Sequence, residues 1–200
     1  AFGEDDDVLA FTITSGLSGS FRAACAAKLN CEENSPSRRI CIIDSLSTGP
    51  EIVLLIEKAV SELSAGADFD AVCRSVQDYQ RRTHLIFALE SLHNLAQNGR
   101  VGKLAAAAAG MLGIRAVGTT SDEGTLDLLG KCRGRKRAVD FLQEEMERLG
   151  YTGGCVRIGH CRNTDSAGEL RTAILHRSMN MRQNSSRSQK GEKAGRKSLS

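Results

Sequence analysis

Residues 8–20 read VLAFTITSGLSGS, an apolar run that ends in two glycines and three serines. The crowded apolar side chains from Val8 to Ile13 predict a buried β-strand, which the serine and glycine residues terminate. Residues 21–28, FRAACAAK, are good helix formers and predict a helix directly after the loop. The loop therefore lies between the carboxyl end of a strand and the amino end of a helix, where free N–H groups favour an anion.

This loop carries the candidate ligand-binding residues. Gly16 and Gly19 permit positive φ angles and close approach of the backbone, and Ser15, Ser18 and Ser20 add hydroxyl donors. The spacing matches neither the GxGxxG nor the GxxxxGK[ST] phosphate loop, and a serine after Gly19 breaks the GxSxG pattern of serine hydrolases. The alternative interpretation is a tight turn in which Ser18 or Ser20 caps the helix.

Composition predicts a soluble globular chain with one large domain or two small ones. It has 200 residues, of which 40% are hydrophobic and 26% are charged. The longest apolar stretch, residues 104–114, is rich in alanine and is too short to cross a bilayer. The chain opens with AFGEDDD, which lacks the basic start of a signal peptide, so we expect a cytoplasmic location.

Cysteine and histidine patterns argue against a metal site. The seven cysteines are an odd number without a CxxC pair, which favours reduced, mostly buried thiols over a disulfide framework or a zinc knuckle. The four histidines show no HExxH spacing. No acid-base partner for Ser15 or Ser18 can be named, which argues against a serine hydrolase. We predict no catalytic residue, no enzyme activity and no cofactor.

The carboxyl-terminal segment, residues 178–200, differs in composition from the rest. It carries six lysine and arginine residues against Glu192, while the whole chain has a formal charge of +3. Its serine, glutamine, asparagine and glycine content predicts a disordered basic tail. A nucleic-acid-binding or other interaction module that acts through this tail is the alternative function.

The remaining sequence predicts an α/β fold with two lobes. The first, residues 1–82, should hold a parallel sheet flanked by helices, and the second, residues 83–177, should be α+β with a largely antiparallel sheet. Beyond the first strand and helix, the expected elements are a loop at 30–39, strand 40–44, a helix from 51 to 64, a helix capped by Asp68 or Asp70, strand 84–89, a short helix at 90–97, an alanine-rich helix at 103–112, a hairpin of 114–120 with 125–131, helix 138–149, strand 155–158, and helix 165–176 capped by Thr164.

Five segments resemble segments of one known family. They are ITSGLSGSF (13–21), CIIDSLST (41–48), ESLHNLAQNGRVGK (90–103), KCRGRKRAVDFL (131–142) and RIGHCRN (157–163). They are similar, in this order, to the ISSGLSGTY, VIDSKS, DTLEYLKKGGRIGK, KVRGRKKAL and IAHAGN segments of the DegV family. Order and spacing agree from Val8 to about His176, so the chain resembles a DegV protein over most of its length.

The resemblance implies a bacterial protein that binds a long-chain fatty acid between two lobes and in some members presents it to a fatty acid kinase. By the same resemblance, Ser15 and the Gly16 N–H would hold the carboxylate, with Ser18 beside them in the lipid-binding loop. Arg100, Arg133 and Arg135 match arginines that are candidates to face the head group or the kinase, with surface or capping contacts as the alternative. His160 matches a histidine at a strand end and is expected to be structural.

The family's first strand with its TSQPS segment and its closing GTHTGPGA segment have no counterpart in the sequence. On this comparison the chain is expected to be truncated at both ends, with exposed strand edges in the first lobe.

Overall fold

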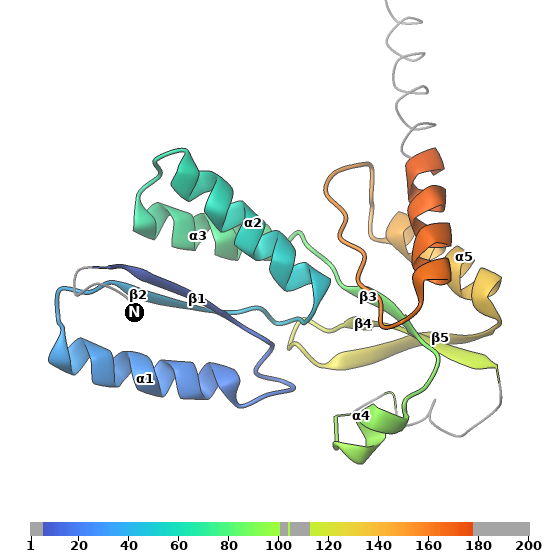
Figure 1. Ribbon diagram of the computed structural model, residues 1–200, viewed down its shortest axis with the longest axis horizontal. Helices are drawn as coiled ribbons and strands as arrows, with labels where there is room; N and C mark the ends of the chain where they lie inside the picture. The colour runs from blue at the N-terminus through green and yellow to red at the C-terminus, as the bar shows by residue number, and fades with distance from the viewer. Residues whose placement is uncertain (1–5, 101–103, 105–112, 178–200) are drawn as a thin grey trace, which may run out of the picture. The chain divides into compact units, whose positions relative to one another are not determined.

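The computed structural model describes residues 6–100, 104 and 113–177 (Figure 1). Two compact units, residues 1–133 and 134–200, divide the chain and are described separately. The predicted lobe boundary after residue 82 stays a prediction. The elements are β1 (Val8–Thr12), α1 (Ser20–Asn34), β2 (Ile40–Asp44), α2 (Pro50–Ser64), α3 (Phe69–Gln80), β3 (Ile86–Leu89), α4 (His93–Gln97), β4 (Ile114–Thr120), β5 (Leu126–Arg133), α5 (Arg135–Arg148) and a helix over residues 164–177.

The first sheet is parallel, as predicted. Strands β1 and β2 pair from Val8 with Ile40 to Thr12 with Asp44. Helix α1 lies on one face of the sheet, and α2 and α3 lie on the other (Figure 1). Because parallel strands share a direction, the loops that follow β1 and β2 leave the sheet at the same edge.

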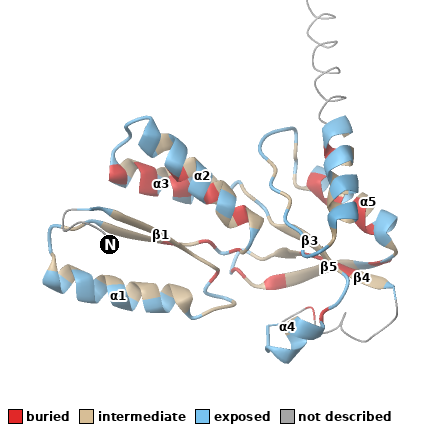
Figure 2. Cartoon of the chain, viewed as in Figure 1, coloured by how far each residue is buried: buried red, intermediate tan, exposed pale blue. Residues whose placement is uncertain are grey.

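A hydrophobic core joins this sheet to α2 and α3. Ile43, Leu55 and Val72 are at most 2% exposed, and Leu9 and Phe11 of β1 pack against the same cluster. Buried residues lie along α2 and α3 (Figure 2). Asp68, one of the two predicted caps, accepts a hydrogen bond from Asp70 N at 3.0 Å and begins α3.

The second sheet has the order β3-β4-β5 and is antiparallel throughout, which confirms the predicted hairpin. The register between β4 and β5 shifts between Val117 and Gly118. A Cβ atom at Gly118 would lie 2.5 Å from the carbonyl oxygen of Asp127 and 2.6 Å from the ring of Phe87. The glycine therefore allows this close approach of the three strands.

In the second unit, α5 and the helix over residues 164–177 are joined by ion pairs. Arg135 pairs with Glu169 at 2.8 Å, and Arg177 pairs with Glu147. Asn163, rather than the predicted Thr164, caps the latter helix, because its Oδ1 accepts from Ser166 N at 3.4 Å. Residues 155–158 are not a strand, since they pair with no strand in the described part of the chain.

Two further expectations are wrong. Helix α1 continues to Asn34 where we expected a loop from residue 30, and Asn34 Nδ2 donates to the carbonyl oxygen of Asn30 at 2.7 Å. The cysteines are not mostly buried: Cys73 and Cys132 are buried, and the other five are exposed or partly exposed. Burial, together with a hydrogen bond to Cys41, raises the pKa of the Cys73 thiol to about 12.

The alanine-rich segment, apart from Leu104, and the basic tail lie outside the described residues. Among the described residues, no helix is long and apolar enough to cross a membrane. In the same part of the chain, no group of histidine, cysteine, aspartate and glutamate side chains fits a metal ion.

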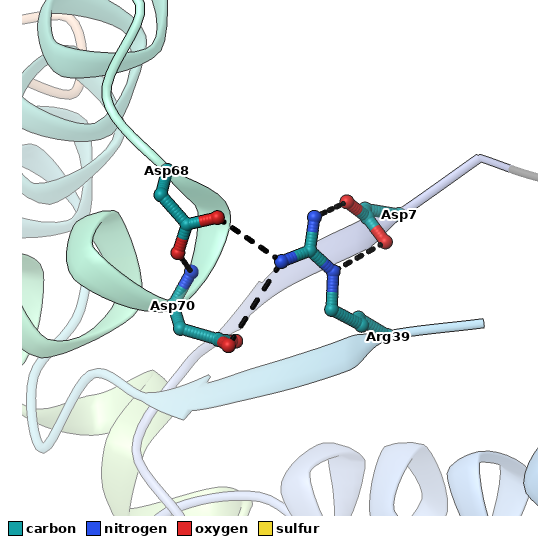
Figure 3. A network of polar contacts seen from close by, with 4 residues as sticks. All are labelled: Asp7, Arg39, Asp68 and Asp70. Carbon is teal, nitrogen blue, oxygen red and sulfur yellow. Dashed lines mark hydrogen bonds and ion pairs between the residues drawn. The ribbon is translucent and has the colours of Figure 1, made fainter. Parts of the chain in front are cut away.

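Arg39 links the start of β1 to the start of α3 (Figure 3). Its guanidinium donates to the two carboxylate oxygens of Asp7 at 3.1 and 2.5 Å and to Asp68 at 3.3 Å. Asp70 lies 3.9 Å away. The side-chain hydrogen bonds to Arg39 lower the pKa values of Asp7 and Asp68 below 3.8, the ordinary value for this side chain.

We expect Arg39→Gln to lower the melting temperature at neutral pH. A carboxyl whose folded-state pKa is depressed contributes stability above its unfolded pKa, and this contribution is lost as the pH falls through the folded pKa. The difference in melting temperature between wild type and variant should therefore shrink below about pH 4. Thermal melts from about pH 3 to pH 7 measure it. Arg74→Gln, an exposed arginine of α3, is the control and should show no such pH dependence.

Candidate functional site

The loop of residues 13–19, which we call the Ser-Gly loop, joins β1 to α1 as predicted. Gly19 is the N-cap residue of α1, so neither Ser18 nor Ser20 caps the helix; the Ser18 hydroxyl instead accepts from Ser20 N at 3.2 Å. Neither Gly16 nor Gly19 has the positive φ angle that we expected, and the φ angle of Gly19 is −75°. Gly16 is required for a different reason, because a Cβ atom there would lie 2.8 Å from the carbonyl oxygen of Gly124.

Thr14 connects three loops of the first unit. It is fully buried, and its N–H donates to the carbonyl oxygen of Ser47, after β2, at 2.9 Å. Its Oγ1 donates to the carbonyl oxygen of Gly124, in the β4–β5 turn, at 2.9 Å. The same Oγ1 accepts from Gly16 N at 3.1 Å. A ligand that bound the Gly16 N–H would therefore share it with Thr14.

Asp44 holds the N–H group of Ser15, the residue before Gly16. Its Oδ1 accepts from Ser15 N and from Leu46 N, each at 3.1 Å. These two N–H groups offset part of the negative charge of the carboxylate. Gln80 Nε2 donates to the Asp44 carbonyl oxygen at 2.9 Å and ties this residue to α3. The backbone of Ser15 is thus fixed while the residue remains exposed.

The serine hydroxyl groups in and beside the Ser-Gly loop are the candidate donors to a ligand. Ser15 is exposed and Ser18 is partly exposed. The Ser20 hydroxyl oxygen is buried without a hydrogen-bond partner among the described residues. Hydroxyl donors at the start of a 15-residue helix suit a negatively charged head group.

The three candidate arginines lie in different surroundings. Arg100 Nε donates to the carbonyl oxygen of Leu17 at 2.9 Å, so its side chain contacts the Ser-Gly loop. Arg133 is exposed at the end of β5 away from the turn that contains Gly124, so the structure does not bring it to this loop. Arg135 belongs to the second unit, where it pairs with Asp165 at 3.1 Å and with Glu169.

His160 is exposed, and its Nδ1 accepts from Asn163 N at 3.4 Å. This contact lies within one turn of the chain just before the helix of residues 164–177. The structural role that we expected for His160 stays a prediction.

Sequence reasoning missed the buried residues and the turn glycine that hold the Ser-Gly loop in place. They are Thr14, Ser45, Ser47, Glu51 and Gly124, of which the first four are at most 5% exposed. One signal was available: polar residues follow two neighbouring parallel strands, whose carboxyl ends form the usual ligand-binding edge of an α/β sheet. The contact with Gly124 carried no such signal, because it joins residues 110 positions apart.

A family model described as "Uncharacterised protein, DegV family" matches residues 2–192. The chain belongs to the DegV family. A DegV domain-containing protein of Streptococcus pyogenes serotype M18 is 44% identical over 163 residues, which are 82% of this chain and 58% of the relative. The predicted resemblance is confirmed, and the chain spans less than two thirds of the length of this DegV relative.

Solved DegV structures have the same fold. A DegV family protein of Eubacterium eligens loaded with heptadecanoic acid is 40% identical, with a TM-score of 0.82 over 86% of this chain and 63% of that one. The Fatty Acid Kinase (Fak) B3 protein of Streptococcus pneumoniae, loaded with linoleic acid, is 38% identical, with a TM-score of 0.81 over 85% and 60% of the two chains. The predicted α/β class, with one parallel and one antiparallel sheet, is confirmed for this DegV chain.

Proposed function

We propose that this DegV chain binds a long-chain fatty acid and holds its carboxylate at the Ser-Gly loop, through Ser15, Gly16 and Ser18. The observation that carries the proposal is that two solved DegV proteins about 40% identical to it are described as loaded with heptadecanoic and linoleic acid. The geometry of the loop supports it: exposed hydroxyl donors lie at the start of a long helix, on a backbone that hydrogen bonds hold in place.

The physical demands of such a ligand fit this arrangement. A tail of about fifteen methylene groups offers on the order of 12 kcal/mol of gross apolar burial before the costs of binding are subtracted. The carboxylate needs hydrogen-bond donors, because an unpaired charge at an apolar site is costly. Hydroxyl and N–H donors meet this need without a metal ion or a cofactor.

We further propose that the chain acts in the cytoplasm and presents the acid to a fatty acid kinase, without catalysis of its own. Support comes from the Streptococcus pneumoniae relative, which is the Fatty Acid Kinase (Fak) B3 protein. Arg100, beside the Ser-Gly loop, is the candidate to face the head group. The exposed Arg133 and Arg135 are the candidates to face the kinase.

Mass spectrometry of lipid extracted from the purified chain tests the proposed ligand. We expect fatty acids at close to one equivalent, and after delipidation we expect saturable binding of linoleic acid. Binding of linoleic acid no tighter than that of the matching alcohol would argue against a carboxylate site. The absence of saturable binding would overturn the proposed function.

We expect Ser15→Ala to weaken linoleic acid binding by about 10- to 150-fold. The substitution removes one hydrogen bond to a charged acceptor, which contributes roughly 1.5–3 kcal/mol. Fluorescence or calorimetric titration of the delipidated protein measures the change. Ser37→Ala, at an exposed serine between α1 and β2, is the matched control and should bind as the wild type does. Equal affinities of the two variants would exclude Ser15 as a head-group ligand.

A further inference from the structure

A chain of hydrogen bonds, carried by three buried side-chain residues, runs from the first turn of α2 to the Ser-Gly loop. It begins at Glu51, continues through Ser47 and Thr14, and ends at the Gly16 N–H. The three side-chain residues are at most 5% exposed. We infer that Glu51, Ser47 and Thr14 are positioning residues that hold the Ser-Gly loop ready for a ligand carboxylate, an inference that rests on the proposed function.

The first link is the pair of Glu51 and Ser47. Ser47 Oγ donates to Glu51 Oε2 at 2.5 Å. A buried carboxylate is costly unless it is hydrogen-bonded, and its place in the first turn of α2 adds the favourable helix dipole. The N-cap residue Gly49 has no side chain to cap this helix, so Glu51 is the acidic residue that interacts favourably with the amino end of α2. Glu51 therefore fixes the direction in which the Ser47 hydroxyl points.

Ser47 in turn holds the start of the Ser-Gly loop. Its N–H donates to Ser45 Oγ at 3.2 Å, and Ser45 Oγ donates to the Ser47 carbonyl oxygen at 2.9 Å. The same carbonyl oxygen accepts the Thr14 N–H at 2.9 Å. All polar groups of Ser47 are thus engaged, which leaves its carbonyl oxygen little freedom to move.

Thr14 connects the Ser47 carbonyl oxygen to the Gly16 N–H of the Ser-Gly loop. With its N–H held by Ser47 and its hydroxyl proton directed at the Gly124 carbonyl oxygen, Oγ1 presents its free lone pair to the Gly16 N–H at 3.1 Å. Asp44 holds the adjacent Ser15 N–H at 3.1 Å. These hydrogen bonds hold the loop backbone through groups of the protein itself, and such preorganisation strengthens binding by lowering its entropic cost.

Two kinds of variant test the inference in the whole chain. Thr14→Val removes the hydroxyl and keeps the shape, whereas Thr14→Ser keeps the hydroxyl. Ser47→Ala interrupts the series of hydrogen bonds at a residue that does not touch Gly16. Its matched control is Ser75→Ala, because Ser75 Oγ donates to Glu62 Oε1 at 2.7 Å in the same kind of serine–glutamate pair between α3 and α2.

The readouts are the Kd for linoleic acid and the ¹H–¹⁵N NMR signal of the Gly16 amide, with its hydrogen-exchange rate. We expect Thr14→Val and Ser47→Ala to raise the Kd at least about tenfold, to shift the Gly16 signal and to speed its exchange. Thr14→Ser should restore both readouts to within about twofold of wild type, and Ser75→Ala should leave them unchanged.

The outcomes separate the inference from the proposed function. If the wild type does not bind linoleic acid, the proposed function fails, and the Gly16 signal still decides whether the hydrogen-bond chain positions the loop. If the wild type binds but Ser47→Ala matches Ser75→Ala in both readouts, the positioning role is overturned alone. Folded Ser47→Ala protein with an unchanged Gly16 signal, or failure of Thr14→Ser to restore binding, also overturns it.

Discussion

Gly124→Ala is expected to lower the free energy of unfolding by roughly 2–5 kcal/mol and to remove most fatty acid binding. The new Cβ atom would lie 2.0 Å from Thr14 Oγ1 and 3.1 Å from the Cα atom of Leu46. Gly124 also has a φ angle of +75°, which an alanine adopts only with strain. Displacement of Thr14 would release the Gly16 N–H, so the loss should appear both in denaturant unfolding and in the Kd of the folded fraction.

Gly66→Ala separates the clash from the backbone strain. Gly66 has a φ angle of +82° at the end of α2, and a Cβ atom there would meet nothing within 4 Å. In this variant we expect backbone strain alone to lower the free energy of unfolding, by roughly 1–2 kcal/mol. Its affinity for linoleic acid should not change. Equal effects of the two variants would show that the contact between Gly124 and Thr14 contributes nothing.

What could be predicted from the sequence was local. The step from β1 through the Ser-Gly loop to α1 follows from crowded apolar residues, then glycine and serine, then alanine-rich sequence, all within about twenty positions. The end of α1 was placed too early because NCEEN, at residues 30–34, is polar. Yet the Asn30–Asn34 hydrogen bonds and the ion pair of Lys28 with Glu32 at 3.6 Å lie along the last turns of the helix.

The parts that could not be predicted depend on contacts between distant segments. Gly124 was interpreted only as part of a hairpin turn, whereas in the structure its backbone touches Gly16 and Thr14. Glu51 was interpreted only as the start of a helix, and nothing in its local sequence shows that its carboxylate is buried against Ser47. The candidate ligand residues could be named from the sequence of the loop, but the residues that hold the loop could be named only from the fold.

Leu55→Ala should lower the free energy of unfolding by roughly 2–5 kcal/mol, the range for deletion of a fully buried leucine side chain. Leu55 is 0% exposed and packs with Ile43, Val72 and Val76 between the parallel sheet and its helices. Denaturant unfolding, followed by circular dichroism, measures the loss as a shift of the midpoint at constant slope.

Val53→Ala, on the same helix, is the control. Val53 is 42% exposed, so its truncation should cost less than about 1 kcal/mol. Both variants should bind linoleic acid with unchanged Kd when folded, because neither belongs to the hydrogen-bond chain that ends at Gly16. A core variant that lost affinity in proportion to its stability would show that the Ser-Gly loop is held by the packing of α2 as a whole. An unchanged Kd in Leu55→Ala, beside a raised one in Ser47→Ala, would assign the positioning to the buried polar groups.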